Sequence, residues 1–178
     1  LGGNNIDPTN PADPGTYMEN EVAVQTSPPW EVLGLNTEAD LIALADNYYT
    51  GGATPPGVMS GITYVKLGDN GGTSNWNPAT IDGTGILVVH NDDFDAVMKN
   101  VMGTFKGIVI SDDMEHINAG AMVIGAMITT NASGNALGLG NANVLYSKAA
   151  INATIATLGA PSGLKNEYEI TPGTWKET

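Results

Sequence analysis

The stretch GILVV, residues 85–89, decides how the rest of the chain is interpreted. It is short, rich in β-branched residues and apolar throughout. Successive side chains of an extended strand point to opposite faces, so both faces of this strand are apolar. That pattern is typical of a strand in a parallel sheet that is covered on both sides. Four other five-residue segments resemble it: GITYV at 61–65, GIVIS at 107–111, GAMIT at 125–129 and NVLYS at 143–147.

The first residues of these five segments are separated by steps of 24, 22, 18 and 18 residues. A strand in each unit of about 20 residues is the pattern of a solenoid, in which each turn buries its apolar face against the next. Glycine begins four of the five segments, and we expect it to form the corner before the strand. The alternative is a chance recurrence of common hydrophobic residues. The sequence therefore predicts a mainly β fold, a small parallel β-solenoid of the β-helix kind with short helices.

Three short helices are expected around the strands. The first, residues 37–49, follows an N-cap threonine with Asp40 three residues later, as in a capping box. The second is inserted near residues 93–102, where Phe94 begins an apolar stripe at helical spacing. The third follows Ser147, a candidate N-cap, and ends at a glycine and a proline.

The chain divides into a lead-in and one domain. Residues 1–36 contain five prolines and few apolar positions, so we expect an extended lead-in, with EVAVQT at 21–26 as a short strand. Residues 37–178 form the single predicted solenoid domain. Its tail, EYEITPGTW, alternates between apolar and polar residues and is expected to add a final strand.

Net charge and composition exclude several classes of partner. The chain carries 19 acidic residues and six basic ones, all lysine, for a net charge of −13. Such a surface repels nucleic acid and anionic lipid, and no arginine is present to bind phosphate in a bidentate way. No cysteine is present, which excludes disulfides and thiolate metal sites. No apolar stretch is long enough to insert into a membrane, and a composition rich in Asn, Thr and Gly favours the exterior of a bacterial cell.

Four motifs occur in the same order as in a known family: GTGILVV at 83–89, FKGIVI at 105–110, GAMVIGAMITT at 120–130 and ANVLYSKAAI at 142–151. Together they resemble the C-terminal region of PilX-type minor pilins, proteins associated with type IV pilus assembly in bacteria. The resemblance covers roughly residues 37–158. It implies a non-catalytic exported subunit, a minor or tip component of a pilus-like filament, that contacts other pilin subunits or assembly proteins.

The chain departs from that family in two places. The family has a short strand with a glycine turn between its first two strands, where this chain has the helical stripe at 93–102. The hydrophobic N-terminal helix of a pilin is also not among these 178 residues. We expect either that it has been removed or that a separate chain supplies it.

Two acidic clusters are the only candidates for chemistry. HNDDFD and SDDMEH each follow a predicted strand, so stacked turns would bring them near one another. Calcium takes six to eight oxygen ligands, but neither spacing is that of an EF-hand. The alternative is that these acids are solvated or hold a helix start. The candidate calcium ligands are Asp92, Asp93, Asp95, Asp112, Asp113 and Glu115.

Enzyme activity is not expected. The chain has no GxSxG, Walker A or HExxH motif, and its two histidines, His90 and His116, lack a third nitrogen or sulfur ligand for zinc. The competing hypothesis is a carbohydrate-binding or polysaccharide-acting β-helix with an acidic cleft. Exposed aromatic residues would favour it, whereas aromatic residues that cap the solenoid would not. The aromatic residues in question are Trp30, Tyr48, Tyr49, Tyr64, Trp76 and Trp175.

Overall fold

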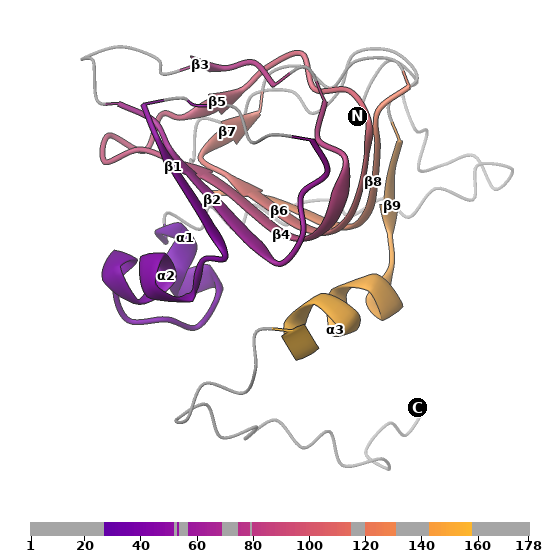
Figure 1. Ribbon diagram of the computed structural model, residues 1–178, viewed down its shortest axis with the longest axis horizontal. Helices are drawn as coiled ribbons and strands as arrows, with labels where there is room; N and C mark the ends of the chain where they lie inside the picture. The colour runs from indigo at the N-terminus through magenta and orange to yellow at the C-terminus, as the bar shows by residue number, and fades with distance from the viewer. Residues whose placement is uncertain are drawn as a thin grey trace, which may run out of the picture.

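Two parallel sheets organise the computed structural model, which describes residues 27–51, 53, 57–68, 75–78, 80–114, 120–130 and 143–157 (Figure 1). The larger sheet has the strand order β1-β2-β4-β6-β8-β9 and the smaller one the order β3-β5-β7. The larger sheet comprises β1 (Asn47–Thr50), β2 (Ile62–Lys66), β4 (Gly83–His90), β6 (Thr104–Ser111), β8 (Met122–Thr129) and β9 (Asn143–Tyr146). The smaller one comprises β3 (Asn75–Trp76), β5 (Val97–Met98) and β7 (Asp113–Met114).

From β2 to β8 the chain alternates between the two sheets, and every strand pairing is parallel. Figure 1 shows the small sheet opposite the large one. One apolar cluster fills the space between them, with Trp76 and Met98 from the small sheet against Val65, Leu87 and Val109 from the large one. These side chains point inward because each lies on the face of its strand that the other sheet covers.

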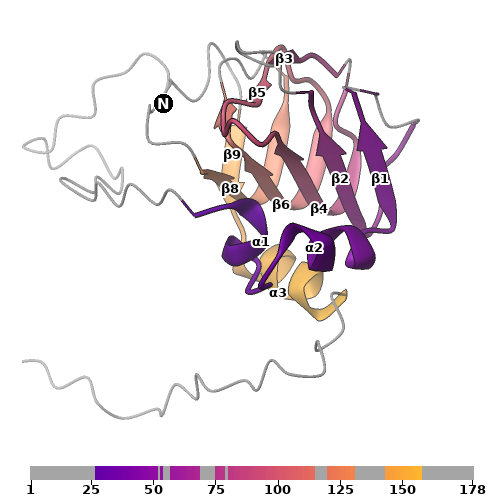
Figure 2. The same ribbon diagram turned by 90° about the vertical axis from the view of Figure 1, so that its left-hand side faces the viewer.

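The outer face of the large sheet is covered by helices α1 (Pro29–Val32), α2 (Glu38–Leu44) and α3 (Lys148–Thr157), as Figures 1 and 2 show. A second apolar cluster lies beneath them, and it contains Leu41 of α2 with the strand residues Tyr64, Val88 and Ile110. Apolar residues on both faces of the pentads are thus explained by one cluster on each side of the sheet.

The five predicted pentads are neighbouring parallel strands, which confirms that part of the prediction. Ile62 pairs with Ile86, Ile86 with Ile108 and Ile108 with Ala126, so the first four pentads align residue by residue. The fifth does not, because Asn143 pairs with Met122 and Tyr146 with Gly125. NVLYS is therefore displaced by three positions from the alignment that its sequence suggests.

Glycines at the start of the pentads form a column inside the sheet. Gly85, Gly107 and Gly125 lie within their strands and have φ angles of 123°, 144° and 143°, which L residues rarely adopt. A Cβ on Gly107 would lie 2.0 Å from the carbonyl oxygen of Gly85. The column therefore holds successive backbones close together at the point where φ is positive.

The predicted first helix is confirmed but shorter than expected. Thr37 and Asp40 make the capping box: the backbone N–H of Asp40 donates to Thr37 Oγ1, and that of Thr37 donates to Asp40 Oδ2. The helix ends at Leu44, and Tyr48 belongs to the edge strand β1 instead. Asp46 turns the chain there, because its carboxylate accepts a hydrogen bond from the backbone N–H of Ile62 at 2.8 Å.

The predicted helix at 93–102 is wrong. This segment contains β5, and Phe94 and Asn100 have φ angles of 57° and 54°, which interrupt a right-handed helix. Polar side chains hold the backbone in this path: Asn91 Oδ1 accepts a hydrogen bond from the N–H of Asp95 at 2.9 Å. The middle of the apolar stripe is nevertheless buried, since Val97, Met98 and Val101 pack in the core, whereas Met102 is 46% exposed.

The third predicted helix is confirmed as α3, and Ser147 Oγ accepts a hydrogen bond from the N–H of Ala150 at 3.2 Å. The described part of the lead-in contains α1, whose Trp30 and Val32 pack against the outer cluster. The predictions for residues 1–26, including the strand EVAVQT, and for the tail after Thr157 lie outside the described residues.

We predict that Gly107→Ala lowers the free energy of unfolding by several kcal/mol, because its Cβ would meet backbone that cannot move aside. Gly51→Ala is the matched control: its φ angle is 66°, but nothing lies within 4 Å of the added Cβ. The control should lose only about 1–2 kcal/mol, the cost of the left-handed conformation. Urea unfolding of both variants measures the difference, and equal losses would contradict the glycine column.

Candidate functional site

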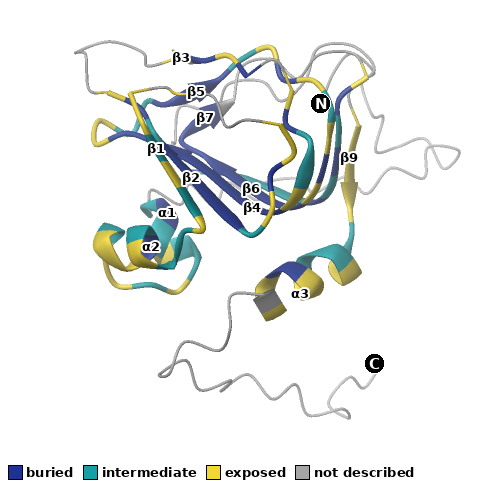
Figure 3. Cartoon of the chain, viewed as in Figure 1, coloured by how far each residue is buried: buried dark blue, intermediate teal, exposed yellow. Residues whose placement is uncertain are grey.

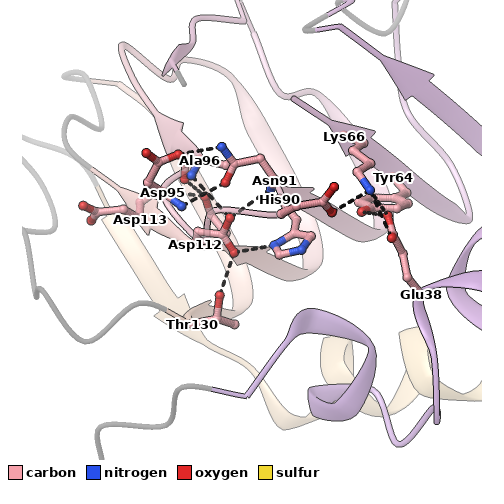
Figure 4. A network of polar contacts seen from close by, with 12 residues as sticks. Glu38, Tyr64, Lys66, His90, Asn91, Asp95, Ala96, Asp112, Asp113 and Thr130 are labelled. Carbon is pink, nitrogen blue, oxygen red and sulfur yellow. Dashed lines mark hydrogen bonds and ion pairs between the residues drawn. The ribbon is translucent and has the colours of Figure 1, made fainter. Parts of the chain in front are cut away.

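Polar residues form a row at the carboxyl ends of four neighbouring strands (Figure 4). Lys66 ends β2 and pairs with His90, which ends β4. Asp112 follows the last residue of β6, and Thr130 follows the last residue of β8. Parallel strands in this register end at the same edge of the sheet. Residues more than 60 positions apart in the sequence thus come together.

Asp112 is the centre of this row. Its Oδ1 accepts a hydrogen bond from Thr130 Oγ1 at 2.9 Å and lies 2.8 Å from His90 Nδ1. Its Oδ2 accepts from the backbone N–H groups of Asn91 at 3.0 Å and Ala96 at 3.3 Å. The side chain is fully buried. Four donors compensate the loss of water around the carboxylate, which is the condition for burying it at tolerable cost.

His90 is oriented by this carboxylate. Where Asp112 is ionised its carboxylate only accepts hydrogen bonds, and the proton between the two groups then lies on His90 Nδ1. Nε2 is buried and has no hydrogen-bond partner among the described residues. The imidazole packs edge-on against Trp30 and Phe94, with ring centroids 5.4 Å and 4.9 Å away.

A carboxylate that holds the Nδ1–H of a histidine is also the arrangement that orients a catalytic base. Here the His90 side chain is 1% exposed, and that of Asp112 is 0% exposed. A general base must come within hydrogen-bond distance of the group it deprotonates. In the described structure the pair is buried and joins the ends of β4, β6 and β8.

A second polar cluster continues the row toward α2. Glu38 accepts a hydrogen bond from the hydroxyl of Tyr64 at 2.7 Å and forms an ion pair with Lys66 at 2.9 Å. Lys66 also pairs with Asp92, with 2.7 Å between Nζ and Oδ1. Glu38 stands in the first turn of α2, so this cluster fixes the helix to strand β2.

The cluster changes the acidity of two of its members. Burial, together with the hydrogen bond to Glu38, raises the pKa of Tyr64 well above its usual value. Burial acts against the charge of Lys66, but the hydrogen bonds to Asp92 and Glu38 outweigh it and raise the pKa of Lys66 above its usual value.

The described residues among the predicted calcium ligands have different contacts and do not face one common point. Asp92 pairs with Lys66, Asp95 accepts a hydrogen bond from the side-chain amide of Asn91, and Asp93 is exposed. Asp112 holds the buried network, and the carbonyl oxygen of Asp113 accepts from Ser111 Oγ at 2.7 Å. Glu115, like His116, lies outside the described residues. Within the described ranges, no three His, Asp or Glu side chains come together to hold a metal ion.

Aromatic residues divide between core and surface. Tyr64 and Trp76 are buried, with 0% and 2% of their surfaces exposed, and Trp30 is half-buried. Tyr48 is 40% exposed and stacks at 5.3 Å on the buried ring of Tyr64. Trp175 lies outside the described residues.

The sequence did not indicate the exposure of β9. Its apolar residues Val144, Leu145 and Tyr146 are 43%, 49% and 77% exposed, and all four residues of the strand are exposed (Figure 3). The composition of NVLYS resembles that of the buried pentads, so it does not indicate that β9 is exposed. The displaced pairing with β8 is what distinguishes it.

Comparisons with protein-family models, curated proteins and solved structures found no match to this chain. In the part of the chain that the structure describes, no helix has the length and apolar character needed to cross a membrane.

The raised pKa values predict that stability falls at alkaline pH. Above about pH 10 the unfolded chain releases protons from Tyr64 and Lys66 that the folded chain retains, so the free energy of unfolding decreases as pH rises. Tyr64→Phe removes one of these protons. The free energy of unfolding of this variant should therefore fall less steeply with pH than that of wild type, by up to about 1.4 kcal/mol per pH unit. Urea unfolding from about pH 8 to pH 11 measures both slopes. Parallel curves for wild type and variant would contradict this assignment.

Proposed function

We propose that this chain is a non-catalytic, exported, pilin-like subunit, a minor or tip component that acts by protein–protein contact, and that it is built as a small parallel β-solenoid. The alternation of β2 through β8 between two parallel sheets supports the solenoid. In such a fold each turn contacts only its neighbours. The end turns are therefore the places where another protein can continue the stack.

The single observation that carries the proposed function is the location of the exposed apolar side chains. Seven large ones are exposed in the described ranges; four of them lie on the edge strands β1 and β9, and a fifth, Val58, lies beside the bridge that Met59 makes to Gly83. The polar groups that could perform chemistry, by contrast, hold turns together or are buried. Exposed apolar residues that lie next to one another, as Val144, Leu145 and Tyr146 do on β9, mark interaction sites on proteins. The five are Tyr48, Val58, Val144, Leu145 and Tyr146.

The segment around β5 also supports the pilin resemblance. The family has a short, glycine-turned strand between its first two strands, which match β4 and β6 here, and this chain has β5 between β4 and β6, where its sequence suggested a helix. The resemblance supports an exported location, and so does the composition, in which only 14% of the residues are charged and none is cysteine.

The proposed function predicts that binding strengthens as salt increases. The net charge of −13 repels acidic partners, and salt reduces this repulsion over distances of about 10 Å at 0.1 M. We expect the immobilised chain to retain pilus components from a solubilised pilus preparation, in amounts that rise along a salt series. The same chain, incubated with a panel of polysaccharides, should release no sugar. Either sugar release or no retention at any salt concentration would contradict the proposed function, and sugar release would favour the carbohydrate hypothesis.

A further inference from the structure

Both edges of the large sheet are formed by half-length strands. At one edge β1 has four residues, which pair with residues 63–66 of β2. At the other edge β9 has four residues, which pair with residues 122–125 of the eight-residue strand β8. β9 thus leaves half of β8 without a partner strand, whereas β1 covers all of β2 but Ile62 and leaves the segment before β2 without a partner strand.

The open parts are complementary in register. At the β8 edge, no described residue pairs with residues 126–129 on the side away from β6. At the β1 edge, residues 58–61 pair toward β4, as the bridge between Met59 and Gly83 shows. No described strand pairs with their other side, where the Asn47 side chain donates to the Ser60 carbonyl at 3.4 Å and the Asp46 carboxylate accepts from the N–H of Ile62. Following the pairings across β4 and β6, Thr63 occupies the same position as Met127, and Gly61 the same position as Gly125.

These positions place β1 and β9 in different halves of a turn. Asn47 is aligned through Thr63 with Met127, so β1 occupies the positions of residues 127–130. β9 occupies the positions of residues 122–125. A β9 strand and a β1 strand placed end to end therefore make one full-length turn, with a single position between them. Two residues correspond to that position: Ser147, which connects β9 to α3, and Asp46, which precedes β1.

We propose that copies of this chain stack head to tail, so that β1 of one copy pairs with residues 127–130 of another while β9 of the second pairs with residues 58–61 of the first. The inference rests on the proposed function, because it assumes that the chain works by protein contact. Each contact adds parallel strands at the ordinary spacing of about 4.8 Å and satisfies backbone groups that the edges leave open. A head-to-tail contact of this kind does not close on itself and produces a filament.

Side chains at the two edges suit the contact. The segments proposed to pair, β1 with residues 127–130 and β9 with residues 58–61, contain no charged residue in a chain of net charge −13, and the acid beside them, Asp46, is held by the N–H of Ile62. Stacking thus brings the two copies together where neither edge strand carries a charge, and it buries the five exposed apolar residues of the ends.

In the stacked arrangement, the side chain of Tyr48 would lie next to Ile128 of the neighbouring copy. It lies in the same position as Tyr64, Val88, Ile110 and Ile128 of the successive strands, on the outer face of the sheet. In a stacked copy its ring would continue this column next to Ile128. A cavity of about 270 Å³ is present there, lined by Glu31, Val32, Ile128, Thr129 and Thr130. The Glu31 carboxylate and the threonine hydroxyls are acceptors for the Tyr48 hydroxyl.

The test uses full-length chains blocked at one end. Leu145→Lys blocks the β9 end, and Tyr48→Lys blocks the β1 end. Wild type should grow in mass with concentration in sedimentation experiments, more strongly at high salt. Each blocked variant alone should remain monomeric, and a mixture of the two should form a one-to-one dimer, because each retains the end that the other has lost. Ile155→Lys is the matched control, because Ile155 is as exposed as Leu145, at 50% against 49%, but lies on α3. It should assemble like wild type.

Several results would overturn the inference. A blocked variant that self-associates as wild type does would show that the contact is not head to tail, and assembly lost equally in Ile155→Lys would show that it is not at the edges. Val58→Lys, at a 76% exposed position, blocks the β1 end if Tyr48→Lys does not fold. A wild type that stays monomeric at high salt also overturns it. If that monomer still retains pilus components, the edges serve a different protein and the proposed function stands.

Discussion

The close approach of backbones at the glycine column is the constraint on which the rest of the structure depends. At Gly85, Gly107 and Gly125 the place of a Cβ is within about 2 Å of the carbonyl oxygen of the preceding glycine. No other residue fits there without a shift of backbone, so the column fixes which residue of one strand faces which residue of the next. That register then stacks the isoleucine and valine positions of β2, β4 and β6 and divides their side chains between the inner and outer clusters.

The same register explains why the polar network needs no dedicated loop. Because the glycines set the strands in register, the strands end in line, and His90, Asp112 and Thr130 meet at their carboxyl ends. The carboxylate of Asp112 then holds the backbone of the β4–β5 connection through Asn91 and Ala96. Polar residues after the pentads thus stabilise the turns, while the exposed apolar residues are left for the ends of the sheet.

The strands could be predicted from the sequence because each pentad is apolar on both faces and recurs at a regular step. The register of β9 could not, since NVLYS lacks the glycine that aligns the other four. The stripe from Phe94 to Val101 suggested a helix because side chains buried along a strand and its turns can reproduce helical spacing. What decides its path is Asp112, which is distant in the sequence and reaches Ala96 only once β4 and β6 are paired. For the same reason the sequence alone suggested calcium ligands in the acidic clusters. The partners of Asp92 and Asp112, which are Lys66 and His90, lie on other strands and are distant in the sequence.

The most direct test of the parallel, glycine-aligned register is a disulfide trap, which this chain allows because it contains no cysteine. Thr84 of β4 and Lys106 of β6 are exposed and directly paired. The double variant Thr84→Cys/Lys106→Cys should form an intramolecular disulfide on mild oxidation, because neighbouring strands lie about 4.8 Å apart and a disulfide spans Cα distances of about 4.4–6.8 Å. Thr84→Cys/Thr104→Cys, two residues out of register, should not. Mass spectrometry under native conditions distinguishes them. Cross-linking only in the second variant would contradict the register.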